Sequence, residues 1–147
     1  MMKSIVTVLI GAEATAGRLA LLEMVEQPGS EPPCHRHYWE DELLYVMEGE
    51  LALFIEGKWL TVPTGRAAMV PRNVEHTFAV LSPTVRLLVL FTPAGFEGFY
   101  QELDAEKLRL QGEATNIERW VATAARYGCE VTGPHPGRPL KTVVSEQ

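Results

Sequence analysis

Short apolar runs rich in β-branched residues recur through the first two-thirds of the chain. Residues that favour turns, mainly glycine, asparagine and proline, separate nearly all of these runs. About eight short strands at this spacing predict a β-sandwich or a β-barrel. The expected strands are Ile5–Ile10, Leu19–Val25, Leu43–Met47, Leu51–Ile55, Trp59–Val62, Ala67–Val70, His76–Leu81 and Val85–Thr92.

One hairpin can be placed within this series. The segment from Leu51 to Val62 reads as two strands joined by Glu56 and Gly57. Gly57 can adopt the positive φ that a tight hairpin turn requires, because it has no Cβ atom. The two strands should therefore be antiparallel neighbours.

The pattern changes to a helical period after Pro93. Apolar side chains then recur about one helical turn apart, at Phe96, Phe99, Tyr100 and Leu103. We expect this stripe to pack on the outside of the barrel. A second helix is expected after Asn116, a suitable N-cap, and should end at Gly128, a suitable C′ residue. The tail from Gly133 to Gln147 is rich in proline and glycine and is expected to be extended and partly disordered.

Length and composition are typical of a single globular domain. The chain has 147 residues, of which 46% are hydrophobic and 22% charged. These shares are close to the averages for globular proteins and show no sign of low complexity. We therefore expect one domain, in which residues 1–95 form the barrel and residues 96–147 form a helical extension and tail.

The charge of the chain and its lack of a long apolar stretch argue against several classes of partner. The formal net charge is -6 and the basic residues are scattered, so we expect neither nucleic acid nor an anionic membrane as a partner. No apolar stretch approaches the roughly 18 to 20 residues of a membrane span. The two cysteines, Cys34 and Cys129, are far apart and suggest no disulfide framework. These features predict a cytoplasmic protein.

The main candidates for functional residues are three histidines and one glutamate. His35 and His37 are two residues apart, so on a strand their side chains point to the same face. Glu42 begins the next apolar run, and His76 opens a later strand whose face it shares with apolar residues. That position suits a side chain that points into a barrel. Three imidazoles and one carboxylate are suitable ligands for a first-row divalent metal ion.

Other polar residues compete for these roles. Glu40 and Asp41 are alternatives to Glu42 as ligand, but Glu42 stands where the strand begins, and the other two are expected to be solvated loop carboxylates. Cys34 should point away from the histidine that follows it and be buried as a small hydrophobic residue. His135 lies in the tail, where we expect no catalytic role.

The spacing of these residues follows two motifs. From Gly29 to Gly49 the sequence reads G-x5-H-x-H-x4-E-x6-G, and from Gly65 to His76 it reads G-x5-P-x-N-x2-H. The sequence therefore resembles the single-domain cupins. The segment that begins at Thr92 adds a resemblance to the bacterial quercetin-dioxygenase-like group of that family.

The resemblance to cupins implies an all-β fold, a jelly-roll β-barrel with the C-terminal helices packed outside it. It also implies a site for one divalent transition metal, Fe, Mn, Ni, Cu or Zn, with the ligands His35, His37, Glu42 and His76. Two positions depart from the family pattern. Asn73 stands where the family usually has glycine, and Asn tolerates the left-handed conformation. Val80 stands where the family usually has asparagine, which makes the pocket more apolar.

Four protein ligands leave one or two positions open on a metal that accepts five or six ligands. Such a site could hold an enolic or aromatic small molecule, with Glu42 as catalytic base. Phe78, Val80, Leu44 and Val46 are expected to line the cavity. We favour dioxygenase chemistry. A metal-binding module without catalysis and an isomerase or lyase remain open, and a homodimer is expected because Ile5–Ile10 could pair across an exposed sheet edge.

Overall fold

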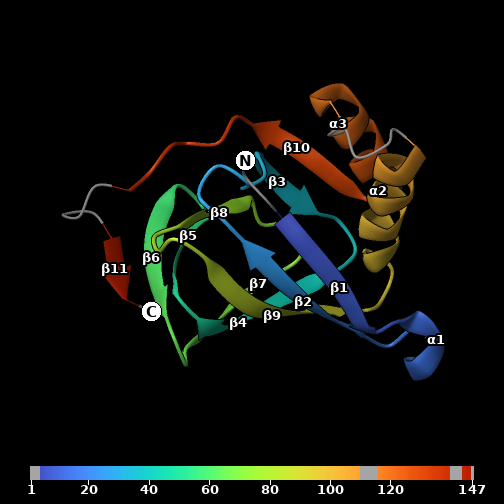
Figure 1. Cartoon of the computed structure of the whole chain (residues 1–147), viewed down its shortest axis with the longest axis horizontal. Helices are drawn as coiled ribbons and strands as arrows, with labels where there is room; N and C mark the ends of the chain where they lie inside the picture. The colour runs from blue at the N-terminus through green and yellow to red at the C-terminus, as the bar shows by residue number, and fades with distance from the viewer. Residues whose placement is uncertain (1–3, 110–115, 140–143, 147) are drawn as a thin grey trace.

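Two β-sheets face each other in the computed structural model, which describes residues 4–109, 116–139 and 144–146 (Figure 1). The strand order is β1-β2-β9-β4-β7 in one sheet and β10-β3-β8-β5-β6-β11 in the other. Neighbouring strands are antiparallel except β11 and β6. The all-β prediction is confirmed. Among the described residues no strand pairing joins the two sheets, so the expected barrel takes the form of two facing sheets.

The strand boundaries agree closely with the expected ones. The five-stranded sheet contains β1 (Ser4–Ile10), β2 (Ala20–Glu26), β9 (Val85–Thr92), β4 (Asp41–Glu48) and β7 (Ala67–Val70). The six-stranded sheet contains β10 (Cys129–Gly133), β3 (Cys34–His37), β8 (His76–Val80), β5 (Glu50–Ile55), β6 (Lys58–Pro63) and β11 (Val144–Glu146).

The main core lies between the two sheets. Buried and partly exposed residues alternate along β2 and β9, because successive side chains of a strand point to opposite faces. The inward side chains form one hydrophobic cluster that includes Leu22, Leu44, Val46, Leu51, Leu53, Val80, Leu87, Val89 and Phe91. This packed interior holds the polar site residues in fixed positions.

Residues with positive φ make the turns that the sequence indicated. Glu56 and Gly57 have φ values of 49° and 78° between β5 and β6, which fits a type I′ hairpin turn. Gly49 has a φ of 88°, and a Cβ atom there would lie 2.4 Å from the carbonyl oxygen of Thr84. Asn73 has a φ of 68°, so it does adopt the left-handed conformation.

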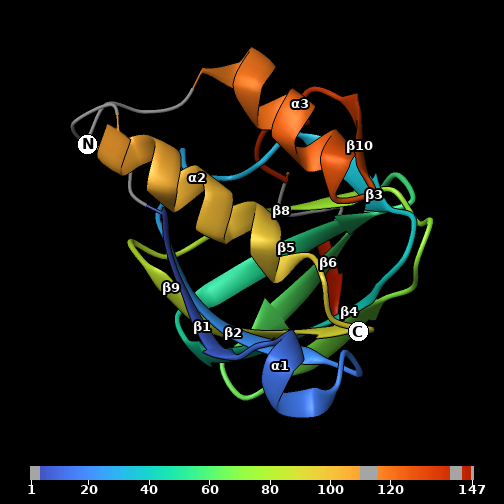
Figure 2. The same cartoon turned by 90° about the vertical axis from the view of Figure 1, so that its right-hand side faces the viewer.

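Three helices accompany the sheets: α1 (Ala12–Thr15), α2 (Glu97–Arg109) and α3 (Ile117–Arg126). The sequence pattern did not predict the short α1. Helices α2 and α3 lie together across one end of the two sheets (Figure 2). Asn116 is the N-cap of α3, as predicted, because its side chain accepts a hydrogen bond from the Arg119 backbone N–H over 2.9 Å. No helix among the described residues is long and apolar enough to cross a membrane.

The last part of the chain contains strands that the sequence pattern did not predict. Strand β10 pairs with β3, and β11 pairs with β6. The tail was expected to be extended, and Val144–Glu146 is an extended strand, whereas residues 134–139 form no helix or strand. Residues 140–143 and Gln147 lie outside the described residues. The pairing of β10 is important for the site, because β3 carries two of the candidate ligands.

Candidate metal centre

The four predicted ligands come from three strands of the two sheets. His35 and His37 lie on β3, Glu42 lies near the start of β4, and His76 is the first residue of β8. His35 and His76 are directly paired in the register of β3 and β8. All four side chains are buried. We call these four residues the candidate centre.

Three side chains of the candidate centre meet closely, and the ring of His35 lies beside them. Oε1 of Glu42 lies 3.2 Å from Nε2 of His37 and 3.2 Å from Nε2 of His76. The ring centroid of His35 lies 4.4 Å from that of His76 and 5.1 Å from that of His37. The structure therefore brings His37, Glu42 and His76 into one group of possible metal ligands, and it places the His35 ring beside them in a second group with His37 and Cys129.

Backbone carbonyl groups orient two of the three imidazole rings. Nδ1 of His35 lies 2.8 Å from the carbonyl oxygen of Pro33, and Nδ1 of His76 lies 3.0 Å from that of Val74. A carbonyl oxygen only accepts hydrogen bonds, so in each ring Nδ1 carries the proton. In a metal-bound centre the lone pair of Nε2 would then bind the ion, in place of the present hydrogen bond between His76 and Glu42. Such partners behind a metal-binding histidine fix its tautomer and orientation.

The charges in the candidate centre are strongly coupled. Burial alone would raise the pKa of Glu42, but hydrogen bonds with His37 and His76 outweigh it and hold that pKa well below its usual range. Burial would lower the pKa of His76, but the hydrogen bond and charge of Glu42 raise it overall. For His35, burial and the neighbouring His76 and His37 lower the pKa well below its ordinary value. A carboxylate and a neutral imidazole are the forms that bind metals.

The donor set fits a divalent transition metal. The ligand atoms of His37, Glu42 and His76 all lie within 4.8 Å of one another. In addition, Nδ1 of the buried His37 has no hydrogen-bond partner, although Oε1 of Glu40 lies 4.0 Å away. Imidazole nitrogens with one carboxylate oxygen suit Fe, Mn, Ni, Cu and Zn.

The comparison with known protein families matches residues 22–92 to the cupin domain. The chain therefore carries a cupin domain. All four residues of the candidate centre lie inside the matched segment. The fold and the two sequence motifs agree with this finding.

Two curated proteins and one solved structure illustrate what the cupin domain is similar to. Quercetin 2,3-dioxygenase of Bacillus subtilis (strain 168) is 24% identical over 89 residues, which are 60% of this chain and 26% of that protein. Polyketide synthase CurC of Streptomyces cyaneus is 31% identical over 65 residues, which are 44% of this chain and 41% of that protein. The chain thus spans less than half of either relative.

The solved structure is that of the polyketide cyclase RemF from Streptomyces resistomycificus. It is 33% identical, with a TM-score of 0.53, and the match covers 62% of this chain and 66% of that chain. These three likenesses support the cupin fold of the matched segment, and they differ in the reactions that their names describe.

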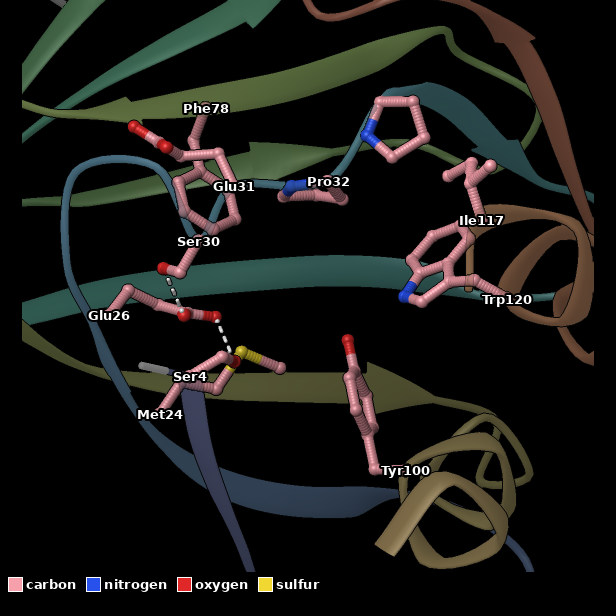
Figure 3. Close-up of a pocket in the computed structure, with 11 residues that line it drawn as sticks. Ser4, Met24, Glu26, Ser30, Glu31, Pro32, Phe78, Tyr100, Ile117 and Trp120 are labelled. Atoms are coloured by element: carbon pink, nitrogen blue, oxygen red, sulfur yellow. Dashed lines mark hydrogen bonds between the residues drawn. The ribbon is translucent and has the colours of Figure 1, made fainter. Parts of the chain in front are cut away.

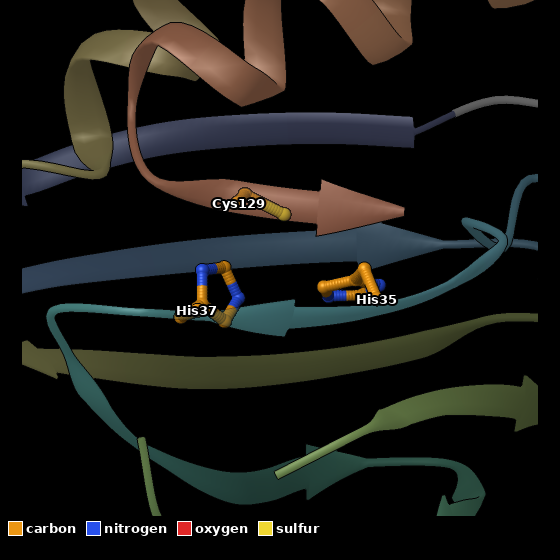
Figure 4. A group of neighbouring side chains, drawn as sticks. All are labelled: His35, His37 and Cys129. Carbon is orange, nitrogen blue, oxygen red and sulfur yellow. The ribbon is translucent and has the colours of Figure 1, made fainter. Parts of the chain in front are cut away.

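Cys129 is a residue of the site that sequence reasoning missed. It is the first residue of β10, where it pairs with His37 of β3, outside the matched cupin segment. Its sulfur lies within 4.8 Å of a ligand nitrogen of both His35 and His37 (Figure 4). Burial raises the pKa of the Cys129 thiol, and the charges of Glu42 and Glu40 raise it further. Cys34, by contrast, is buried and belongs to neither group of candidate metal ligands, as expected.

Glu40 is not the solvated loop carboxylate that the sequence suggested. Its side chain is 2% exposed, and burial raises its pKa to about 7. Its Oε2 lies near Gly95, because an ideal Cβ at that glycine would be 3.5 Å away. The segment before α2 therefore covers Glu40, and Glu40 faces His37 from the side opposite Glu42.

The candidate centre opens into a small cavity with mainly apolar walls. Leu44 and Phe78 line this cavity, as predicted, whereas Val46 and Val80 are buried in the core and line neither this cavity nor its neighbour. The C-terminal extension, residues 96–147, contributes three aromatic side chains to the cavity wall, namely Phe96, Tyr100 and Trp120. The ring centroid of Phe96 lies 4.4 Å from that of His37. Packing alone explains Phe99, as expected, but Phe96 and Tyr100 also line the cavity.

Proposed function

We propose that this protein is a metal-dependent enzyme that binds one divalent transition metal at the candidate centre. The close approach of three buried imidazoles and the Glu42 carboxylate supports this proposal most directly. A single divalent metal ion would bind these buried imidazole nitrogens and the carboxylate oxygen together. The ligands would be His35, His37, Glu42 and His76, and the metal Fe, Mn, Ni, Cu or Zn.

The substrate class follows from the cavity walls. Neither the small cavity nor the larger one beside it is lined by a described lysine or arginine. An anionic sugar acid or keto acid would find no lysine or arginine there, so the metal ion would have to hold it alone while Glu42 and Glu26 repel it. A neutral enolic or phenolic compound fits the aromatic and apolar walls better.

Glu42 is the proposed catalytic base. A bound divalent ion supplies Lewis acidity toward an enolic or phenolic oxygen, which lowers the pKa of that hydroxyl group. The Glu42 carboxylate is placed to accept the released proton, because it lies among the proposed ligands at the wall of the small cavity. The apolar walls limit the access of water and so strengthen the electrostatic interactions in the site.

We favour a dioxygenase-type reaction, in which the enolate reacts with dioxygen and both oxygen atoms enter the product. The likeness to quercetin 2,3-dioxygenase supports this choice. The second candidate is an oxygen-independent isomerase or lyase reaction on the same substrate class, which the likeness to the polyketide cyclase RemF favours. A binding module without catalysis is the remaining alternative.

The assembly and location of the protein also remain proposals. Strand β1 is an edge of the five-stranded sheet, and Ile5 and Leu9 are about half exposed. A second copy that pairs along β1 would cover this edge, so we propose a homodimer. Cys34 and Cys129 are both free, which agrees with a reducing cytoplasm.

The decisive experiment combines metal analysis with oxygen consumption. The protein is loaded in turn with Fe, Mn, Ni, Cu and Zn, and enolic and phenolic compounds are supplied with and without oxygen. Oxygen uptake in proportion to substrate loss supports the dioxygenase. Substrate loss without oxygen uptake supports the isomerase or lyase, and binding without any loss supports the binding module.

A further inference from the structure

A second, larger cavity of about 280 Å³ lies beside the candidate centre. We call it the outer cavity. It shares five lining residues with the small cavity, namely Met24, Pro32, Phe78, Tyr100 and Trp120. The ring centroid of Trp120 lies 6.4 Å from that of His35, so one aromatic side chain borders both spaces. A ligand held at the candidate centre could therefore extend into the outer cavity.

A buried carboxylate stands in the wall of the outer cavity. Glu26, the last residue of β2, is 4% exposed. One of its oxygens accepts a hydrogen bond from Ser4 and the other accepts one from Ser30, both over 2.8 Å (Figure 3). A carboxylate offers about four acceptor positions, so two serine donors leave acceptor capacity unused.

Other polar atoms face the same space. The Tyr100 hydroxyl and the Trp120 indole nitrogen point into the outer cavity from the side opposite Glu26 (Figure 3). Glu31 also accepts two hydrogen bonds, from the backbone N–H groups of Gly29 and Val80, but its side chain is only partly buried. Glu26 is therefore the buried carboxylate in the wall of this cavity that a ligand could reach.

We propose that Glu26 is a second recognition point, which binds a distal phenolic hydroxyl of an elongated aromatic substrate. This inference rests on the proposed function, in which the enolic oxygen of the same molecule lies at the candidate centre. The aromatic rings of the substrate would lie between the two points, against Phe78, Tyr100 and Trp120. Glu26 would thereby determine specificity without touching the reacting atoms.

A neutral hydroxyl suits Glu26 better than an anionic group does. A carboxylate ligand would be repelled by Glu26 and by the neighbouring Glu31. Burial raises the pKa of Glu26 to about 7, although Ser4 and Ser30 lower it and Lys107 also acts in that direction. A hydroxyl group both donates and accepts hydrogen bonds, so it can pair with either protonation state of Glu26.

The test measures binding and does not require turnover. Calorimetry compares 3-hydroxyflavone with 3,4′-dihydroxyflavone, which differs by one distal hydroxyl, on Zn²⁺-loaded protein, because zinc is redox-inactive. We expect the wild type to bind the dihydroxy compound about tenfold more tightly, as for a hydrogen bond to a charged group. Glu26→Ala should abolish this preference and leave the affinity for 3-hydroxyflavone within about twofold of wild type.

Two further variants complete the test, one at Glu26 itself and one as a control. Glu26→Gln is isosteric and retains an amide oxygen, so it should keep a preference of about threefold, and it carries the test if Glu26→Ala does not fold. Glu118→Gln makes the same chemical change at an exposed position of α3 outside the cavity lining. This control should keep the full preference.

The outcomes separate this inference from the proposed function. Equal affinities of the wild type for the two flavonols would overturn the role of Glu26. A preference for the dihydroxy compound that is unchanged in both Glu26 variants would do the same. In either case, binding of 3-hydroxyflavone would still support the enolic substrate. Tighter binding of a 4′-ammoniomethyl analogue would overturn the neutral hydroxyl and identify a cation site. Failure of both flavonols to bind the zinc-loaded wild type would overturn the inference and the proposed substrate class together.

Discussion

Oε1 of Glu42 lies 3.2 Å from Nε2 of His76, a residue 34 positions later in the chain and in the opposite sheet. This contact joins the two sheets at the candidate centre. It also keeps Glu42 ionised, because the hydrogen bonds with His76 and His37 outweigh the effect of burial on its pKa. The contacts of Glu42 with the histidines underlie the first two predictions.

Removal of one imidazole should remove the metal. His37→Ala deletes a donor that contacts Glu42 and leaves the alternation of β3 intact, so metal content should fall from about one ion per chain to nearly none. With metal at about 100 times its Kd, the wild type gains about 2.7 kcal/mol in free energy of unfolding. The variant should therefore unfold about 5 to 10 °C lower. Elemental analysis and thermal unfolding measure both effects.

The fourth histidine of the chain offers a matched control. Nε2 of His135 lies 2.8 Å from the backbone oxygen of Phe78, and His135 belongs to neither group of candidate metal ligands. His135→Ala should therefore keep the metal. Full occupancy in His37→Ala, or equal losses in both variants, would contradict the ligand assignment.

The catalytic role of Glu42 predicts a loss of turnover that exceeds the loss of metal. In Glu42→Gln the amide oxygen can still bind a metal ion but the side chain cannot accept a proton. The rate should fall about a hundred- to ten-thousandfold, while metal content falls much less. Asp41→Asn, on the same strand but paired with the exposed Arg72, is the control and should retain activity. Unchanged turnover in Glu42→Gln would leave Glu42 as a ligand only.

The sequence predicted the candidate centre because its signals are local. Alternation along a strand places His35 and His37 on one face, whatever the rest of the fold does. The spacing of the two motifs then added Glu42 and His76. Neither signal depends on how the C-terminal third of the chain packs, so the sequence alone could select these four residues, and their role as metal ligands stays a prediction.

The missed residues depend on contacts between distant segments. Cys129 reaches the site only because a five-residue strand after α3 pairs with β3, and no local pattern distinguishes that strand from a loop. Glu40 had the sequence appearance of a solvated residue, and the segment around Gly95 buries it. Trp120 likewise reaches the cavity through the docking of α3. Such placements follow from tertiary packing and not from residue type.

The edge strand β1 predicts the mode of assembly. Its outward side chains Ile5 and Leu9 are 54% and 49% exposed, so a second copy could bury them. The double variant Ile5→Lys/Leu9→Lys should shift a dimer to monomer at micromolar concentration, because lysines on an edge strand oppose pairing. Sedimentation measures the change. A wild type that is strictly monomeric would contradict the proposal, and metal content serves as the control for correct folding.

The buried Glu26 predicts how stability depends on pH. Its pKa is about 7 in the folded protein and 4.5 without burial, so between these values the folded state binds more protons than the unfolded state. The contribution of Glu26 to the free energy of unfolding therefore decreases as pH rises from about 4.5 to 7 and is constant above pH 7.

Glu26→Gln resembles the protonated form and does not titrate. Relative to wild type, the variant should gain at most about 3 kcal/mol between pH 5 and pH 8. Urea unfolding of both proteins at pH 5, 6, 7 and 8, with a chelator present to exclude metal binding, measures this difference. The contributions of Glu40 and Glu42 are common to both proteins and cancel, so a difference that does not vary with pH would show that Glu26 is ionised throughout this range.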